Sequence, residues 1–268
     1  MEFIAYIASA LIGVSLGLVG GGGAILTVPV LVYLFRISPL LATSYSLFIV
    51  GSTSLIATFN NFKQQLINFK VALVFGTSSL STVFLIRKFL IPVIPQNIFN
   101  IGNFTITENM LMLSLFALLM IAAAISMIYN GQNKKEQAAL NTNPIQIAKL
   151  LLYGVGIGII TGLLGAGGGF LIIPTLVILL GLKMKEAIAT SLMIIALNSL
   201  LGLIGDIGHF KIDWPFLLGV TLIAVAGSFA GTLINKKINE HKLKKGFGWF
   251  ILAMGISILI KEIFFKII

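Results

Sequence analysis

Two pairs of neighbouring hydroxyl side chains, Thr43-Ser44 and Thr190-Ser191, stand in equivalent places along the chain, each after an alanine and a glycine-rich stretch. Hydroxyls and the peptide N–H groups of glycine are uncharged donors, and such donors stabilise oxyanions where they converge. The pairs are therefore candidates for an anion-binding site. Hydroxyls in apolar helices also bond to a carbonyl one turn earlier, which is the alternative interpretation.

The glycine-rich stretches are the first glycine strip, residues 20–23, and the second glycine strip, residues 165–169. Each glycine costs roughly 1 kcal/mol of helix propensity, so we expect the helix to break at both strips. A half-helix that begins after a strip would direct free N–H groups and a positive dipole end at one interior point, which favours anions. Close helix packing is the competing explanation. The candidate substrate-binding glycines are Gly21, Gly22, Gly23, Gly167, Gly168 and Gly169.

Four further polar residues lie in or near the second copy of this pattern. Asn198 is expected to be a buried amide that either contributes to the site or joins two helices. Asp206 and His209 are expected close to the end of an apolar segment, where they serve gating or proton coupling or belong to a solvated loop. Asp213 is expected to anchor the start of a helix, beside Trp214 at the membrane interface.

The elements that position these residues are apolar segments of bilayer length. The chain is 58% hydrophobic and 10% charged, far below the roughly 25% charged content of soluble domains. This composition predicts an all-α, multi-pass integral protein of the cell (inner) membrane, with the lipid bilayer as its partner. The lysines lie singly or in short groups between apolar runs, so the net charge of +10 does not indicate nucleic-acid binding. No cysteine is present, and no cofactor or metal is expected.

The chain contains two copies of one unit. Residues 12–29, IGVSLGLVGGGGAILTVP, match residues 157–174, IGIITGLLGAGGGFLIIP, at nine of eighteen positions. Two shorter matches follow in the same order, Ala-Thr-Ser at 42–44 and 189–191, and Ile67-Asn68-Phe69 with Ile212-Asp213-Trp214. We therefore predict an N-terminal membrane repeat over 1–130, a polar linker over 131–145 and a C-terminal membrane repeat over 146–268. The internal counterpart of the first segment also argues against a cleaved signal peptide.

Each half is expected to hold four segments, of which the first is broken or re-entrant. The 33 residues from Phe3 to Phe35 would make a helix of about 50 Å, too long for a hydrocarbon core of about 30 Å. Ordinary spans are predicted near 38–60, 69–90 and 108–129, and near 184–205, 213–235 and 247–265, with residues 87–107 as a loop. The interiors of these spans are expected to hold no Lys, Arg, Asp or Glu. If the broken segments are hairpins, twelve of the 18 Lys and Arg residues share one side, and the two halves form an inverted repeat.

The segments GLVGGGGAILTVP and GLLGAGGGFLIIP, each followed by Ala-Thr-Ser, resemble those of the sulfite exporter TauE/SafE family of membrane permeases. The stretch Gly208-His209-Phe210-Lys211-Ile212-Asp213-Trp214 is similar to that family's Gly-x-Val/Ile-Asp-Trp signature. The resemblance covers nearly the whole chain. It implies export of sulfite or a related organosulfur anion, with no enzyme activity.

Two other functions stay open beside export of a small anion such as sulfite or sulfoacetate. One is ion-coupled import of an anionic nutrient, which would need a coupling site. The other is an intramembrane hydrolase using a serine and His209. The pattern Gly-x-Ser-x-Gly occurs at residues 13–17, but inside an apolar run rather than at the strand-to-helix turn that exposes such a nucleophile. The sequence also leaves open whether copies of the chain form a homo-oligomer.

Overall fold

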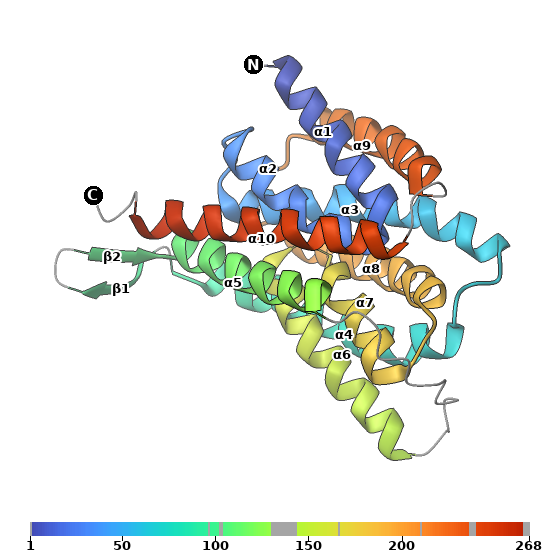
Figure 1. Cartoon of the computed structure of the whole chain (residues 1–268). Coiled ribbons are helices and arrows are strands. Elements are labelled where there is room, and N and C mark those ends of the chain that lie inside the picture. The colour runs from blue at the N-terminus through green and yellow to red at the C-terminus, as the bar shows by residue number, and fades with distance from the viewer. Residues whose placement is uncertain are drawn as a thin grey trace.

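A computed structural model describes residues 2–95, 97–101, 104–129, 144–165, 167–209, 211–235 and 240–264. The described part is helical except for one antiparallel β hairpin between α4 and α5 (Figure 1). The predicted linker, 131–145, falls outside the described residues except for its last two. The N-terminal half contains α1 (Glu2–Val19), η1 (Gly20–Leu26), α2 (Thr27–Tyr33), α3 (Pro39–Lys63), α4 (Phe69–Leu85), η2 (Ile86–Leu90), η3 (Ile91–Val93), β1 (Asn97–Ile101), β2 (Phe104–Thr107) and α5 (Glu108–Tyr129). The C-terminal half contains α6 (Pro144–Leu164), α7 (Gly169–Leu180), α8 (Met184–Asp206), α9 (Trp214–Asn235) and α10 (Glu240–Phe264).

Several helices have the length and apolar composition needed to cross a bilayer. Within the described residues these segments are Pro39–Lys63, Phe69–Val93, Ile147–Leu164, Lys185–Asp206 and Trp214–Ile234. Four of them match predicted spans closely, although Phe69–Val93 continues past its predicted end because α4 runs on into η2 and η3. Residues 87–93 are therefore helical, and the prediction of a loop beginning at Arg87 was wrong. The π turn is followed by a 3₁₀ turn that has Pro92 near its start, and the segment ends at Val93, two residues before Pro95. The fifth segment, Ile147–Leu164, lies in the predicted broken segment, and the predicted spans 108–129 and 247–265 are not among these segments.

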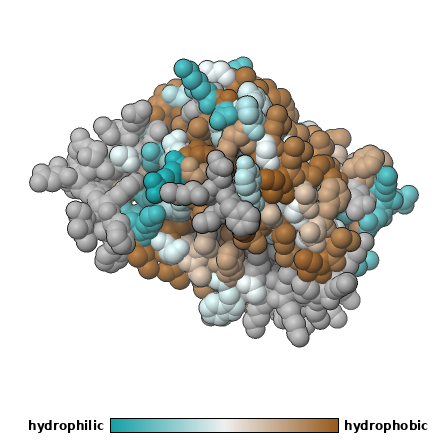
Figure 2. Space-filling view, turned by 90° about the horizontal axis from the view of Figure 1, so that it is seen from above, coloured by the Kyte–Doolittle hydropathy of each residue, from teal (hydrophilic) through white to brown (hydrophobic). Residues whose placement is uncertain are grey.

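The outer surface of the described helices is apolar, as a lipid-facing surface must be. Leu73 on α4, Leu152 on α6 and Leu222 on α9 each expose about 70% of their surface. Figure 2 shows hydrophobic residues over most of the described part of one face, with small hydrophilic groups mainly toward its edges. Leucines exposed to this extent on three bilayer-length helices indicate contact with hydrocarbon chains.

The two halves interlock through a repeated pattern of helix pairs. Helix α1 packs along α9, and its counterpart α6 packs along α4, the counterpart of α9 (Figure 1). Both contacts are close: a Cβ at Gly17 would overlap the backbone at Ser228, and one at Gly158 would overlap Ser79 and Thr82. Helices α3 and α8, which are counterparts, pack on each other, as do α5 and α10. Exchanging the two halves therefore maps these four helix pairs onto one another.

Both glycine strips interrupt the α-helix, as the sequence predicts. At the first strip, α1 ends at Val19 and a 3₁₀ helix follows, whose Gly23 carbonyl accepts a 3.3 Å bond from the Ser15 hydroxyl on α1. The chain thus folds back beside the helix it has just left. At the second strip, Gly165, Gly167 and Gly168 have φ values of 63°, 65° and 70°, and α7 begins at Gly169. These left-handed values require glycine.

The two strips differ in the secondary structure that follows them. The sequence predicts a half-helix with free N–H groups directly after each strip. In the first copy the residues after Gly23 remain in the 3₁₀ helix, which bonds N–H groups to carbonyls three residues earlier. Only in the second copy does a helix begin directly after the glycines.

Candidate functional site

The two glycine strips touch each other where the halves meet. A Cβ at Gly21 would lie 3.1 Å from the Cα of Gly169, and a Cβ at Gly169 would overlap the Gly21 carbonyl. The Ile195 side chain of α8 also lies against Gly21. Both strips were predicted to face the protein interior, and the contact between Gly21 and Gly169 lies in the interior. Any larger residue at Gly21 or Gly169 would push the two halves apart.

The first hydroxyl pair lies in the second turn of α3, fully buried beside two charged residues. The Thr43 Oγ1 donates to the Leu40 carbonyl at 2.7 Å and accepts a 3.0 Å bond from Nη1 of Arg87. The Ser44 Oγ donates to Oδ2 of Asp206 at 2.5 Å. Thr43 thus makes the local bond expected of a helix hydroxyl, and both hydroxyls also contact an ion.

Arg87 and Asp206 form an ion pair with no exposure to solvent. The Nη1 of Arg87 lies 2.9 Å from Oδ2 of Asp206, and both side chains are 0% exposed. Arg87 comes from η2 in the N-terminal half, and Asp206 is the last residue of α8 in the C-terminal half. Burying a charge without a partner is very costly, so each of the two requires the other.

This ion pair corrects two expectations from the sequence. The apolar interior contains charged side chains, whereas Lys, Arg, Asp and Glu were all expected to lie outside it. Asp206, expected at the interface or in a solvated loop, turns its carboxylate inward because Arg87 and Ser44 bind it. His209, three residues on, is exposed, and its backbone N–H donates to the Asp206 carbonyl at 3.1 Å.

The second glycine strip reaches this cluster through Gly165. A Cβ on Gly165 would overlap both Thr43 and the Nη2 end of the Arg87 guanidinium. The strip therefore contacts the ion pair directly, through a glycine that was not among the predicted binding residues. Thr43, Ser44, Arg87, Gly165 and Asp206 together form what we call the charged cluster.

The second hydroxyl pair does not have the surroundings of the first. Thr190 accepts a 2.9 Å bond from the backbone N–H of Asn68, and Ser191 donates to the Ile188 carbonyl at 2.8 Å. Both side chains are buried, and the bonds recorded for them among the described residues go to backbone groups. The two hydroxyl pairs were predicted to be equivalent parts of an oxyanion site. Only Thr43-Ser44 lies beside charged side chains.

Asn198 joins two helices. Its Nδ2 donates to the Ser79 hydroxyl of α4 at 2.6 Å, and its side chain is 1% exposed. Gly167 lies nearby, since a Cβ there would meet the Ser199 hydroxyl at 2.9 Å. Gly168 packs against Thr161 of α6. Ser199 and Thr161 therefore lie against the second strip, and within the described residues no hydrogen bond joins them or Asn198 to the ion pair.

The predicted anchoring role of Asp213 is confirmed. Its Oδ1 accepts a 3.2 Å bond from the Phe216 N–H at the start of α9. Asn68 caps α4 in the same way, accepting from Val71 at 3.2 Å. Asn and Asp are equally good N-caps, so the change between the two copies leaves this function intact.

Arg87 is the residue of the charged cluster that was not predicted from the sequence. Its signal was present, because the predicted span 69–90 contains Arg87 near its end, and the chain has only one other arginine, Arg36. Arginine keeps its charge when buried and forms planar paired bonds with carboxylates, which suits an interior position better than lysine does.

Bilayer-length apolar helices around a buried polar cluster define a multi-pass integral membrane protein. The sequence profile described as Sulfite exporter TauE/SafE matches residues 5–258. The chain therefore belongs to the TauE/SafE sulfite exporter family, and it is a membrane transporter rather than an enzyme.

Named relatives agree with this assignment at the level of transport. The chain is 25% identical to "Probable membrane transporter protein YunE" of Bacillus subtilis, over 98% of this chain and 100% of the relative. It is also 25% identical to a "Probable membrane transporter protein" of Xylella fastidiosa, over 93% and 91% of the two chains. A shorter match, 33% identical over 40% and 42%, is to "Probable membrane transporter protein MJ0441" of Methanocaldococcus jannaschii. No solved structure matches the chain.

Proposed function

We propose that this transporter exports a small oxyanion across the cell (inner) membrane, with sulfite or an organosulfonate such as sulfoacetate as substrate. The single observation that carries the proposal is the charged cluster, because it places a cation and two hydroxyls against the second glycine strip. A buried cation supplies the attraction that the sequence analysis assigned to dipoles and hydroxyls alone. The family description, which names sulfite export, supports the same class of substrate.

We further infer that the halves form an inverted repeat around re-entrant hairpins. In Figure 1, α1 begins at the upper left and α6 at the lower right, and both end near the middle. Helices α2 and α7 then lead back toward the sides from which α1 and α6 came. With α1–α2 and α6–α7 as hairpins, helices α3, α4 and α5 and then helices α8, α9 and α10 supply three crossings in each half. This number is odd, so successive halves take opposite directions. Rocking of one half against the other around the strips would expose the site alternately to each side.

The membrane potential can drive this export. A potential negative inside favours outward movement of a monovalent anion by about 2.3 kcal/mol per 100 mV, which is roughly a fiftyfold concentration ratio. The test is efflux of labelled sulfite, sulfoacetate and acetate from proteoliposomes, with the potential set by a potassium gradient and valinomycin. We expect efflux to be faster when the interior is negative. Efflux that ignores the potential contradicts the proposal.

Ion-coupled import is the second candidate, and a specific observation supports it. Asp206 is a buried carboxylate, and it could carry a coupling proton in a state in which a bound anion has replaced it on Arg87. Under this mechanism an imposed proton gradient would drive anion accumulation without a potential. The same proteoliposomes, given a pH gradient at zero potential, distinguish the two mechanisms.

A further inference from the structure

The ion pair leaves the larger part of the Arg87 guanidinium without a partner. Its Nη1 makes both recorded bonds, to Asp206 and to Thr43. Its Nε and Nη2 are buried, and neither has a hydrogen-bond partner among the described residues. Oδ1 of Asp206 is likewise buried without a partner in that part of the chain. Buried donors without acceptors are costly, so this arrangement favours a ligand that supplies acceptors.

The free groups have a definite shape. Nε and Nη2 form one side of the planar guanidinium, with two N–H bonds that point in nearly the same direction. This fork matches two oxygens carried on one atom, as in a sulfonate, sulfite or carboxylate. A monatomic anion such as chloride offers one acceptor to both N–H groups, so its two bonds are bent and weaker than the two straight bonds to a pair of oxygens. Gly165, which has no side chain, lies against the Nη2 end of the fork.

We propose that Arg87 is the substrate-binding residue and that Asp206 is its resident counter-anion, which holds Nη1 while the site is empty. The substrate binds through two oxygens to Nε and Nη2. This inference rests on the proposed function and specifies the substrate class, an oxyanion with two or more oxygens on one central atom.

Substrate binding then changes the balance of charge in the cluster. With substrate bound, Arg87 faces two anions, Asp206 and the substrate, so the buried cluster has a net negative charge. Such a charge is unfavourable away from water. Asp206 relieves it by leaving Arg87 or by taking a proton. Because Asp206 ends α8 and is followed by exposed residues 207–209, its release moves the carboxylate toward the surface. The occupied and empty sites thus differ in one ion pair between the two halves.

The test measures thermal unfolding of the purified full chain in detergent during titration with sulfite, methanesulfonate, acetate or chloride. For the wild type we expect saturable stabilisation by the three oxyanions and none by chloride at equal ionic strength. Arg87→Lys keeps the charge and removes the fork, so we expect the Kd for sulfite to rise by about thirtyfold or more. Equal stabilisation by chloride, no response to any oxyanion, or unchanged affinity in Arg87→Lys would each overturn the inference.

A second variant separates binding from folding. Arg87→Gln combined with Asp206→Asn removes both charges and leaves neither one unpaired, so the protein can fold. If the pair is only structural, this double variant binds sulfite as the wild type does, and the inference fails. If Arg87 is the ligand, the folded double variant shows no oxyanion response. Lys88→Gln, which removes the exposed cation next in the chain, is the matched control and should bind normally.

The two proposals fail in different ways. Oxyanion binding by the wild type that is lost with Arg87, without any flux in proteoliposomes, overturns export and leaves the binding assignment standing. Potential-driven flux that persists in the double variant overturns the assignment of Arg87 and leaves export standing.

Discussion

Within the described residues, Asp206 is the only acidic residue that forms an ion pair with Arg87. Its two carboxylate oxygens are used unequally. Oδ2 accepts from both Ser44 and Arg87, while Oδ1 has no partner within the described chain. A pair bonded through one oxygen is weaker than a bidentate pair, which uses both. It is therefore easier to open when another anion approaches Arg87. The incomplete ion pair would therefore allow a bound anion to replace Asp206 on Arg87.

Replacing Asp206 by Asn should make the stability of the protein depend on anions. The change leaves the Arg87 charge buried without a counter-ion, and the expected loss is about 3–5 kcal/mol of unfolding free energy. Sulfite should restore much of this loss, since it replaces the missing carboxylate, and the restoration should exceed its effect on the wild type. Thermal unfolding with and without sulfite measures both effects.

The control for this variant is Asp213→Asn. Asp213 is exposed and caps α9, and Asn caps equally well, so stability should change by no more than about 0.5 kcal/mol. An Asp206→Asn protein as stable as the wild type in the absence of anions would show that Arg87 has another partner.

Replacing Gly165 by Ala should disturb the charged cluster while changing no charge. The residue has φ 63°, and a Cβ would overlap Thr43 and the Arg87 guanidinium. A left-handed conformation costs a non-glycine residue about 1–2 kcal/mol, and overpacking adds about 1–3 kcal/mol. We expect lower thermal stability together with weaker sulfite binding.

Gly156→Ala provides the comparison, because a Cβ on Gly156 of α6 meets nothing within 4 Å. That variant should retain both stability and binding. Normal sulfite binding by Gly165→Ala would show that the second strip does not shape the binding site.

At the scale of elements, patterns that repeat along the chain were predictable and single long-range contacts were not. The breaks at both strips follow from glycine propensity, and the spans follow from apolar length. The ion pair joins positions 119 residues apart, on elements whose relative placement no local pattern encodes. The unequal surroundings of Thr43-Ser44 and Thr190-Ser191 have the same cause. Their local sequences are alike, but only the first pair faces Arg87.

Asn198 shows how a packing role can be distinguished from a binding role. Asn198→Ala removes its 2.6 Å bond to Ser79, and we expect a loss of about 1–3 kcal/mol in unfolding free energy. The sulfite Kd should stay unchanged if the residue only joins α8 to α4. Ser79→Ala and the double variant complete a mutant cycle, which should give a coupling energy of about 0.5–3 kcal/mol. A large increase in Kd with Asn198→Ala would instead make the amide part of the site.

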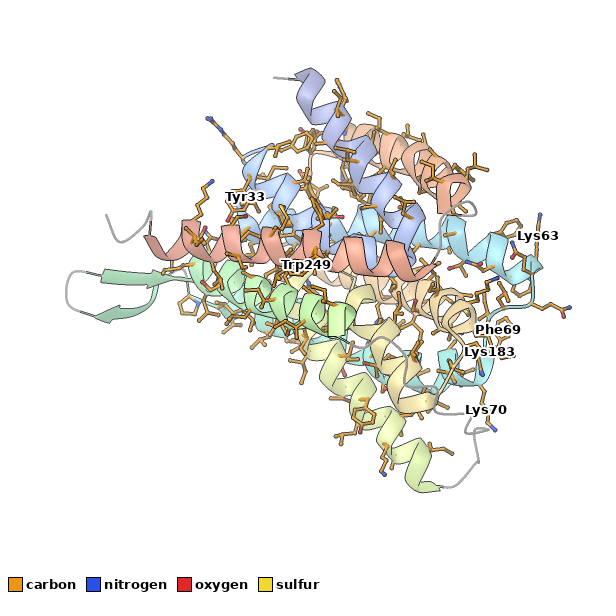
Figure 3. The ribbon with its side chains drawn as sticks, in the orientation of Figure 1. Tyr33, Lys63, Phe69, Lys70, Lys183 and Trp249 are labelled. Carbon is orange, nitrogen blue, oxygen red and sulfur yellow. The ribbon has the colours of Figure 1, made fainter. Side chains whose placement is uncertain are left out.

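At the scale of the whole molecule, the charged cluster lies toward one end of the helix bundle. Helix α3 begins there, while α4 and α8 reach it at their C-terminal ends. Figure 3 places Lys63, Lys70 and Lys183 at the opposite end of the bundle, and Tyr33 at the same end as the start of α3. Lysine-rich ends face the cytoplasm in multi-pass proteins. The charged cluster is therefore expected nearer the external face, where it can hold an anion before release.

Cysteine labelling tests this orientation directly, because the chain contains no cysteine of its own. Single cysteines at Lys63, Lys70 and Lys183, all exposed, should react with a membrane-impermeant maleimide only after the cells are opened. A cysteine at Arg36, exposed just after α2, should react in intact cells. Leu222→Cys, 70% exposed on the lipid-facing side of α9, should resist the reagent in both cases and serves as the control. If Arg36 and Lys63 react from the same side, α3 does not cross the membrane, and the hairpin topology with its inverted halves is wrong.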